Sequence, residues 1–142
     1  MNDLAFVARI VDLLESSRLR VWLAGGWAEE LRGLRPPCAH SDVDFLYPGR
    51  DFGRVDRFLA ETPAAREWTG KRTQRTRAFE LDGVLVELLL VQRDDRGWFS
   101  ELAQGRYRWP DDVFLAGSRI PVVSEAALLG YRAAHAVAAR AA

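Results

Sequence analysis

Two aspartates, Asp42 and Asp44, lie one residue apart in the segment 42–47, whose other residues are typical of a β-strand. Because alternate residues of a strand point to the same face, the two carboxylates are predicted to project together. Neighbouring carboxylates repel each other, so in an apolar setting one takes up a proton unless a cation neutralises both. Oxygen-only ligands favour magnesium or manganese over zinc. The alternative interpretation is a solvated strand face that carries both aspartates.

A third carboxylate, Glu87, interrupts the apolar run 84–91, which follows an Asp-Gly pair at 82–83. Asp-Gly between two apolar segments is typical of a two-residue β-hairpin turn, and the run predicts a central strand covered on both faces. A lone carboxylate there is costly unless it is neutralised or paired. Two interpretations follow: a third member of the aspartate site, or the partner of an arginine. If the predicted strand register is wrong, Glu80 rather than Glu87 is the candidate for the third carboxylate.

The pair Gly25-Gly26 separates a short apolar strand at 20–24 from a helix-forming segment at 27–32. Glycines at such a step let the backbone come close to a ligand, and the free N–H groups at a helix start can hold a phosphate. The alternative is a tight connection with no ligand.

Together with Trp27, Ala28, Arg35 and His40, these residues resemble the signature of the nucleotidyltransferase fold, in particular the small nucleotidyltransferases that act on aminoglycosides and lincosamides. That family's motif runs Gly-Gly-Trp-Ala, a Gly-Arg pair, then Arg-x-His-x-Asp-(Ile/Val)-Asp, and the spacing from Gly25 to Asp44 fits without a gap. Cys38 stands where the family usually has an arginine, and Gly33-Leu34-Arg35 replaces the Gly-Arg pair. The third carboxylate of the family is normally aspartate, so Glu87 is longer by one methylene. The resemblance spans about residues 21–131.

The resemblance implies an α/β (α+β) nucleotidyltransferase, or polymerase beta-like, fold, in which helices pack on a mixed central sheet. Residues 1–142 would form a single minimal domain that transfers AMP from ATP to a hydroxyl of an aminoglycoside- or lincosamide-like acceptor and releases pyrophosphate. Its cofactor would be one or two Mg²⁺ ions. The implied catalytic and metal residues are Asp42, Asp44 and Glu87, and the implied nucleotide-binding residues are Gly25, Gly26, Arg35 and His40. A structural role for His40 is an equal alternative.

A minimal domain would have a shallow acceptor pocket, so we expect a homodimer in which the partner subunit completes it. Two other functions stay open. One is a minimal nucleotidyltransferase of a toxin–antitoxin pair that modifies a protein. The other is a degenerate member that binds nucleotide without transfer.

The composition is that of a globular domain, with 49% apolar and 28% charged residues and a formal net charge of zero. A neutral chain is not drawn as a whole to nucleic acid or to an anionic membrane. A single cysteine, Cys38, excludes an internal disulfide. The sequence contains no apolar run of membrane-spanning length and no export signal, so we expect a cytoplasmic protein.

Helices are predicted from Asn2, as N-cap, to about Ser16, from Asp51 to Thr62, and after Ser124. Residues 92–104 are predicted to be a loop with a short amphipathic piece. The segment 66–77 is rich in basic residues, which indicates either a basic edge near a triphosphate or a solvated strand and loop. Aromatic residues at 107–114 either line an acceptor pocket or fill the core.

Overall fold

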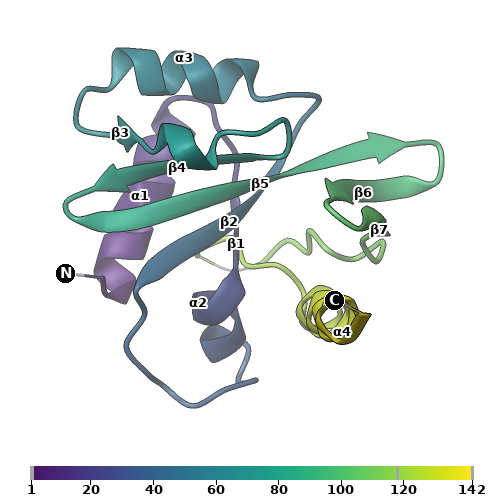
Figure 1. Cartoon of the computed structure of the whole chain (residues 1–142). Helices are drawn as coiled ribbons and strands as arrows, with labels where there is room; N and C mark the ends of the chain where they lie inside the picture. Colours follow the sequence, from purple (N-terminus) through teal and green to yellow (C-terminus); the bar gives the residue numbers. More distant parts are fainter. Residues whose placement is uncertain (1, 118, 142) are drawn as a thin grey trace.

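The computed structural model describes residues 2–117 and 119–141, with side chains as far as Ala136. Strand β5 (Val84–Asp94) runs through the centre of one mixed sheet (Figure 1). Its neighbours on the two sides are β2 (Asp42–Pro48), which is parallel to it, and β4 (Thr76–Leu81), which is antiparallel. The outer strands are β1 (Trp22–Ala24) and β3 (Arg66–Glu67), and among these five strands every pair except β2–β5 is antiparallel. This is the mixed central sheet that the family resemblance implied.

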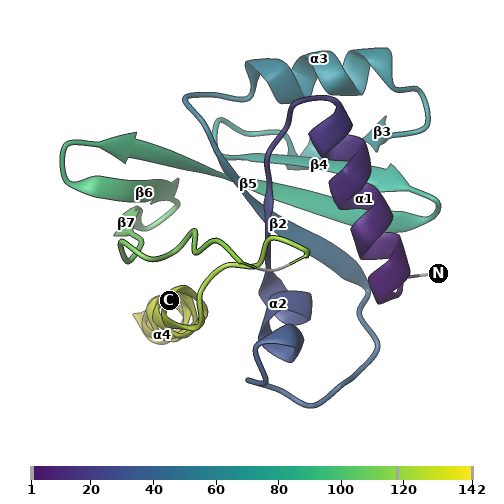
Figure 2. The same ribbon diagram turned by 180° about the vertical axis from the view of Figure 1, so that it is seen from behind.

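The helices flank this sheet. Helix α1 (Leu4–Ser16) crosses the face that is turned to the viewer in Figure 2, and α3 (Gly53–Glu61) lies beside β3 and β4. Helix α2 (Gly25–Leu31) follows β1 without a break and contacts α4 (Glu125–Ala141). A short 3-10 helix, η1 (Thr69–Lys71), connects β3 to β4. No helix in the described part of the chain is long and apolar enough to cross a membrane.

The two faces of the β2–β5 pair differ in burial. Val43, Phe45, Val86 and Leu88 point to the face covered by α1 and α3 and are at most 1% exposed. On the opposite face the three carboxylates, Leu85 and Leu89 are only half-buried, whereas Leu46 and Val91 farther along the strands are buried. The prediction that β5 is covered on both faces is therefore wrong for the part of that face around Glu87. That face is the floor of a cavity, where a carboxylate keeps part of its hydration.

The predicted β4–β5 hairpin is confirmed. Asp82 and Gly83 at its tip both have positive φ, of 50° and 77°. Two positive φ values in succession are the requirement of the tight turn for which Asp-Gly is favoured. The turn sets the β4–β5 register, in which Glu87 pairs with Ala78. Glu80 lies opposite Leu85 in the same register and forms an ion pair with Arg66. Glu87 therefore remains the third carboxylate, and the alternative candidate Glu80 is not needed.

Two local predictions are wrong. Asp3 rather than Asn2 is the N-cap of α1, since its Oδ1 accepts a hydrogen bond from the Phe6 N–H. The segment 92–104, expected to be a loop, instead continues β5 and forms strand β6 (Gly97–Leu102), which pairs with β7 (Gly105–Arg108). Buried Ser100 ties this hairpin down, because its hydroxyl donates to the Leu90 carbonyl and accepts from the indole of Trp109. A polar residue in an inward position had hidden the strand pattern.

Candidate active site

Asp44 and Glu87 are direct partners in the register of the parallel strands β2 and β5. Asp42, two residues earlier on β2, projects from the same face as Asp44. One carboxylate oxygen from each of Asp42, Asp44 and Glu87 lies within 4.8 Å of the other two. The structure therefore brings together the three acids that the sequence singled out, and Glu87 turns toward the aspartates.

Three acids at this distance need positive charge. Burial, the charge of Asp42, and the hydrogen bond and charge of Glu87 together raise the pKa of Asp44 to about 7. Lys71 acts in the opposite direction, because its ammonium lies against the cluster. All three ligands are half-buried carboxylates, and their combined negative charge exceeds the positive charge of Lys71. Such an all-oxygen set fits Mg²⁺ or Mn²⁺ well and Zn²⁺ poorly.

Lys71 is the site residue that the sequence interpretation did not single out. Its Nζ lies 2.6 Å from Oε1 of Glu87, and this contact raises the pKa of the lysine. An arginine was the expected partner in the structural interpretation of Glu87. The chain contains only one lysine, and its position in a segment of arginines was the only sequence feature that could have drawn attention to it.

The other basic side chains of that segment mostly form ion pairs away from the three carboxylates. Arg66 pairs with Glu80, whereas Arg72 and Arg77 share Asp56. The basic segment is thus an ion-paired surface, apart from the one ammonium that reaches the acids.

Gly25 is required where it stands. Its φ is +61°, and a Cβ built on it lies 2.3 Å from Oδ2 of Asp44. Such a distance is a steric clash, so any side chain here displaces either helix α2 or the aspartate. No side chain caps the start of α2, so its first N–H groups have no side-chain acceptor there.

His40 and Arg35 approach the second glycine. A Cβ built on Gly26 lies 3.0 Å from Nδ1 of His40 and 3.0 Å from Nη1 of Arg35. The His40 ring also packs on Trp27, with ring centroids 4.2 Å apart. The four residues predicted to bind nucleotide are therefore gathered around the N-terminus of α2, next to the carboxylates.

A cavity of about 480 Å³ opens over the acidic face of the sheet. Asp44 and Glu87 lie on its floor, and Trp109 and Tyr131 form a wall in which their rings stack with centroids 5.1 Å apart. Burial, and to a lesser degree the charge of Asp44, raises the pKa of Tyr131. Two roles were predicted for the aromatic region, pocket lining and core filling. Trp109 has both, because it lines the cavity and is also buried in the core.

The rim of the cavity comes from helices α2 and α4. Glu29 forms an ion pair with Arg132, which joins the two helices across the opening. His135 lines the cavity as well and packs edge-on against Tyr131, with ring centroids 4.2 Å apart. The meeting of α2 and α4 at this rim was not predicted, because the two helices are distant along the chain.

Comparisons with known proteins agree with this fold. The family model described as aminoglycoside-2''-adenylyltransferase matches residues 6–137. Comparison with curated protein sequences found no significant match.

Solved structures with the same fold include ANT(2'')-Ia in complex with adenylyl-2''-tobramycin, with a TM-score of 0.67 and 20% identity over 94% of this chain and 76% of that chain. The lincosamide antibiotic adenylyltransferase LnuA, bound to lincomycin, has a TM-score of 0.69 and 19% identity over 89% of this chain and 84% of that chain. A protein of Thermotoga maritima thought to be a nucleotidyltransferase has a TM-score of 0.61 and 20% identity, covering 97% of this chain and 87% of that one.

Proposed function

The chain belongs to the aminoglycoside-2''-adenylyltransferase family, and we propose that it transfers AMP from ATP to a hydroxyl of an aminoglycoside- or lincosamide-like acceptor. The observation that carries this proposal is the register pairing of Asp44 with Glu87, which completes a site of three carboxylates beside the glycine step. Because ATP is the donor, we place the reaction in the cytoplasm.

Asp42, Asp44 and Glu87 would hold one or two Mg²⁺ ions. When bound, such ions neutralise the triphosphate and stabilise charge on the oxygens around the reacting phosphorus. The raised pKa of Asp44 supports this assignment, because a divalent cation would offset the repulsion that Asp44 meets from Asp42 and Glu87.

In the proposed reaction the acceptor oxygen attacks the α-phosphorus of ATP. The bond from that phosphorus to the oxygen bridging to the β-phosphate breaks, and pyrophosphate leaves with the electron pair of that bond. The hydroxyl proton passes to a carboxylate at the floor of the cavity, for which Glu87 is our candidate because it faces the cavity. Holding both reactants against one floor removes most of the entropic cost of their meeting.

The triphosphate would lie against the start of helix α2. The backbone N–H groups of Gly25 and Gly26 are the proposed donors to it, and His40 and Arg35 are close enough to Gly26 to add contacts from the side. Lys71, whose ammonium contacts Glu87, supplies a further positive charge beside the carboxylates.

The acceptor would occupy the remaining part of the cavity. The Trp109–Tyr131 wall offers flat apolar surface for the face of a sugar ring, and Glu29 with Arg132 offers charged groups at the rim. We propose that residues 1–142 act as one domain in a homodimer whose partner subunit closes the open side of this cavity. Light scattering at micromolar concentration tests this arrangement, and a strict monomer would contradict it.

The activity itself is tested by incubating the protein with ATP, Mg²⁺ and a panel of aminoglycosides and lincosamides, followed by mass spectrometry of the drugs. We expect a mass gain of one AMP on at least one drug. A gain on a protein in a lysate of the source cells, with none on any drug, would favour the toxin–antitoxin function instead. Nucleotide binding with no transfer to either would favour a degenerate member. The Glu87→Gln variant is the matched control for background transfer.

A further inference from the structure

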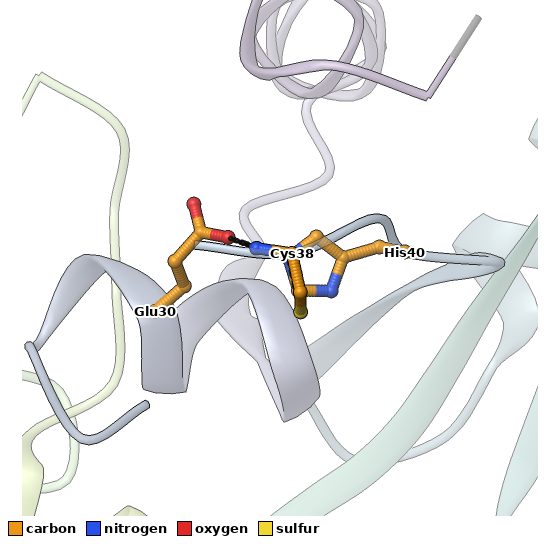
Figure 3. A group of neighbouring side chains, drawn as sticks. All are labelled: Glu30, Cys38 and His40. Carbon is orange, nitrogen blue, oxygen red and sulfur yellow. Dashed lines mark hydrogen bonds and ion pairs between the residues drawn. The ribbon is translucent and has the colours of Figure 1, made fainter. Parts of the chain in front are cut away.

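Glu30, Cys38 and His40 form a second cluster of metal-ligating side chains, separate from the three carboxylates (Figure 3). Helix α2 supplies Glu30, and the loop between α2 and β2 supplies the other two. One ligand atom of each residue lies within 4.8 Å of those of the other two. The cluster offers one nitrogen, one sulfur and one oxygen ligand, a set quite unlike the all-oxygen set on the sheet.

The spacing of these atoms is close to that of a tetrahedral site. His40 Nε2 lies 3.0 Å from Glu30 Oε1 and 3.9 Å from Cys38 Sγ. Ordinary zinc–nitrogen, zinc–oxygen and zinc–sulfur bonds at tetrahedral angles place such ligand atoms roughly 3.3 to 3.5 Å apart. We propose that Glu30, Cys38 and His40 bind a divalent transition metal ion of the zinc class, with water at the fourth position.

Two of the three ligands are already held in place. The His40 side chain is 5% exposed and packs on the Trp27 ring, while that of Glu30 is 16% exposed. Asn2 fixes the same region from the other side, because its amide donates to the His40 carbonyl and accepts from the Trp27 indole. A metal ion therefore orders little beyond the Cys38 side chain, which keeps the entropic cost of binding low.

Cys38 provides the entry path and the selectivity. It is exposed, so an ion from solvent meets the thiol first. Binding would release the Cys38 thiol proton and leave the single proton of a neutral His40 imidazole on Nδ1, giving a thiolate and an imidazole nitrogen that soft ions prefer. Mg²⁺ favours neither of these ligands, so the two sites would take different metals.

The cluster is linked to the glycine step through His40. With its Nε2 on a metal, the imidazole carries its remaining proton on Nδ1, the atom next to Gly26. The metal would thereby hold the loop and give His40 a fixed N–H donor on the phosphate side. This link rests on the proposed function, whereas the metal site itself does not.

Co²⁺ is the probe for this site, because the chain has a single cysteine and any thiolate-to-cobalt absorption band reports Cys38. Chelator-treated protein kept reduced with a phosphine is titrated with Co²⁺, and Zn²⁺ is then added as competitor. We expect a near-ultraviolet band that saturates at one ion per chain and disappears as Zn²⁺ displaces Co²⁺. The Cys38→Ser variant should lose the band, and His40→Gln and Glu30→Gln should each weaken binding by more than about tenfold.

The control is Asp42→Asn, which alters the all-oxygen site and should leave the cobalt band unchanged. Circular dichroism establishes that each variant is folded, and Glu30→Asp replaces Glu30→Gln if the latter is not. The proposal is overturned if no band forms, or if saturation occurs at one ion per two chains. It is also overturned if both the His40 and the Glu30 variants bind as tightly as the original chain.

Discussion

Asp44 on β2 and Glu87 on β5 pair directly across two parallel strands, and their carboxylates meet on the cavity face of the sheet. A shift of the register by one residue would send one of the two acids into the apolar core. The alternation of β2 and β5 fixes where each side chain points, and the Asp82-Gly83 turn sets the register of β5 against β4 on its other side.

Replacement of Gly25 by alanine separates backbone strain from a clash with the active site. Gly25→Ala adds a Cβ 2.3 Å from Asp44 Oδ2 at a φ of +61°, whereas Gly33→Ala meets only the strain of a φ of +74° in open space. We expect both variants to lose about 1 kcal/mol or more of unfolding free energy. Only Gly25→Ala should also weaken Mn²⁺ binding, measured by titration calorimetry. Equal Mn²⁺ affinity in the two variants would contradict the close approach of α2 to Asp44.

Two variants of Glu87 test whether its carboxylate takes part in catalysis or has only a packing role. Glu87→Gln keeps the volume and removes the charge, and we expect kcat to fall by about 10² to 10⁴. Glu87→Asp keeps the charge on a shorter arm and should retain much of the activity, since the resemblance places an aspartate at this position. The measurement is initial-rate kinetics with ATP and the acceptor found in the panel. A Gln variant as active as the Asp variant would remove Glu87 from the mechanism.

The raised pKa of Asp44 predicts a pH dependence of stability in metal-free protein. The pKa rises from its ordinary 3.8 to about 7 on folding, so the folded state binds the proton more tightly than the unfolded state. This contribution is complete below the unfolded pKa and is lost as the pH rises through about 7. Thermal unfolding between about pH 5.5 and about pH 8 should show a fall in Tm that Asp44→Asn lacks.

In the same experiment, each kcal/mol of change in the unfolding free energy corresponds to a shift in Tm of roughly 2 to 4 °C in a protein of this size class. Asp44→Asn should be the more stable protein at the alkaline end without metal. Addition of Mg²⁺ should reverse that order, because the ion binds the carboxylate and not the amide. Parallel pH profiles for the two proteins would show that Asp44 does not titrate in this range.

Lys71 should compete with metal for Glu87. Because both side chains of this ion pair are partly exposed, Lys71→Gln is expected to cost only about 0.2 to 1 kcal/mol of stability without metal. It should tighten Mn²⁺ binding by up to about tenfold, since the ion no longer displaces an ammonium. Arg66→Gln, which breaks the ion pair with Glu80, is the matched control. The competition is refuted if the two variants bind Mn²⁺ equally.

Much of this site was predictable because its signals are local. The alternation at 42–47, the Asp-Gly turn and the lone carboxylate in an apolar run each follow from residues close together in the sequence. Each also obeys a strand rule, so the three acids and their common face could be predicted before the structure.

The parts that could not be predicted depend on contacts between distant segments. Lys71 reaches Glu87 only because η1 folds back over the sheet, and a run of arginines with one lysine does not reveal that path. The β6–β7 hairpin was hidden by Ser100, which is buried only because Trp109 and the Leu90 carbonyl satisfy it. Asn2 is a residue type that often caps helices, yet its side chain forms hydrogen bonds with Trp27 and with the loop before β2.

The most direct test of the three-carboxylate site compares transfer by Asp44→Ala and by Asp12→Ala, an exposed aspartate on α1 across the sheet. Both proteins are incubated with ATP, Mg²⁺ and the acceptor, and the adenylylated product is quantified by mass spectrometry, with circular dichroism to establish folding. We predict that Asp12→Ala equals the original chain, whereas Asp44→Ala loses more than about a hundredfold of its rate. Folded Asp44→Ala that still transfers AMP at the original rate would contradict the account.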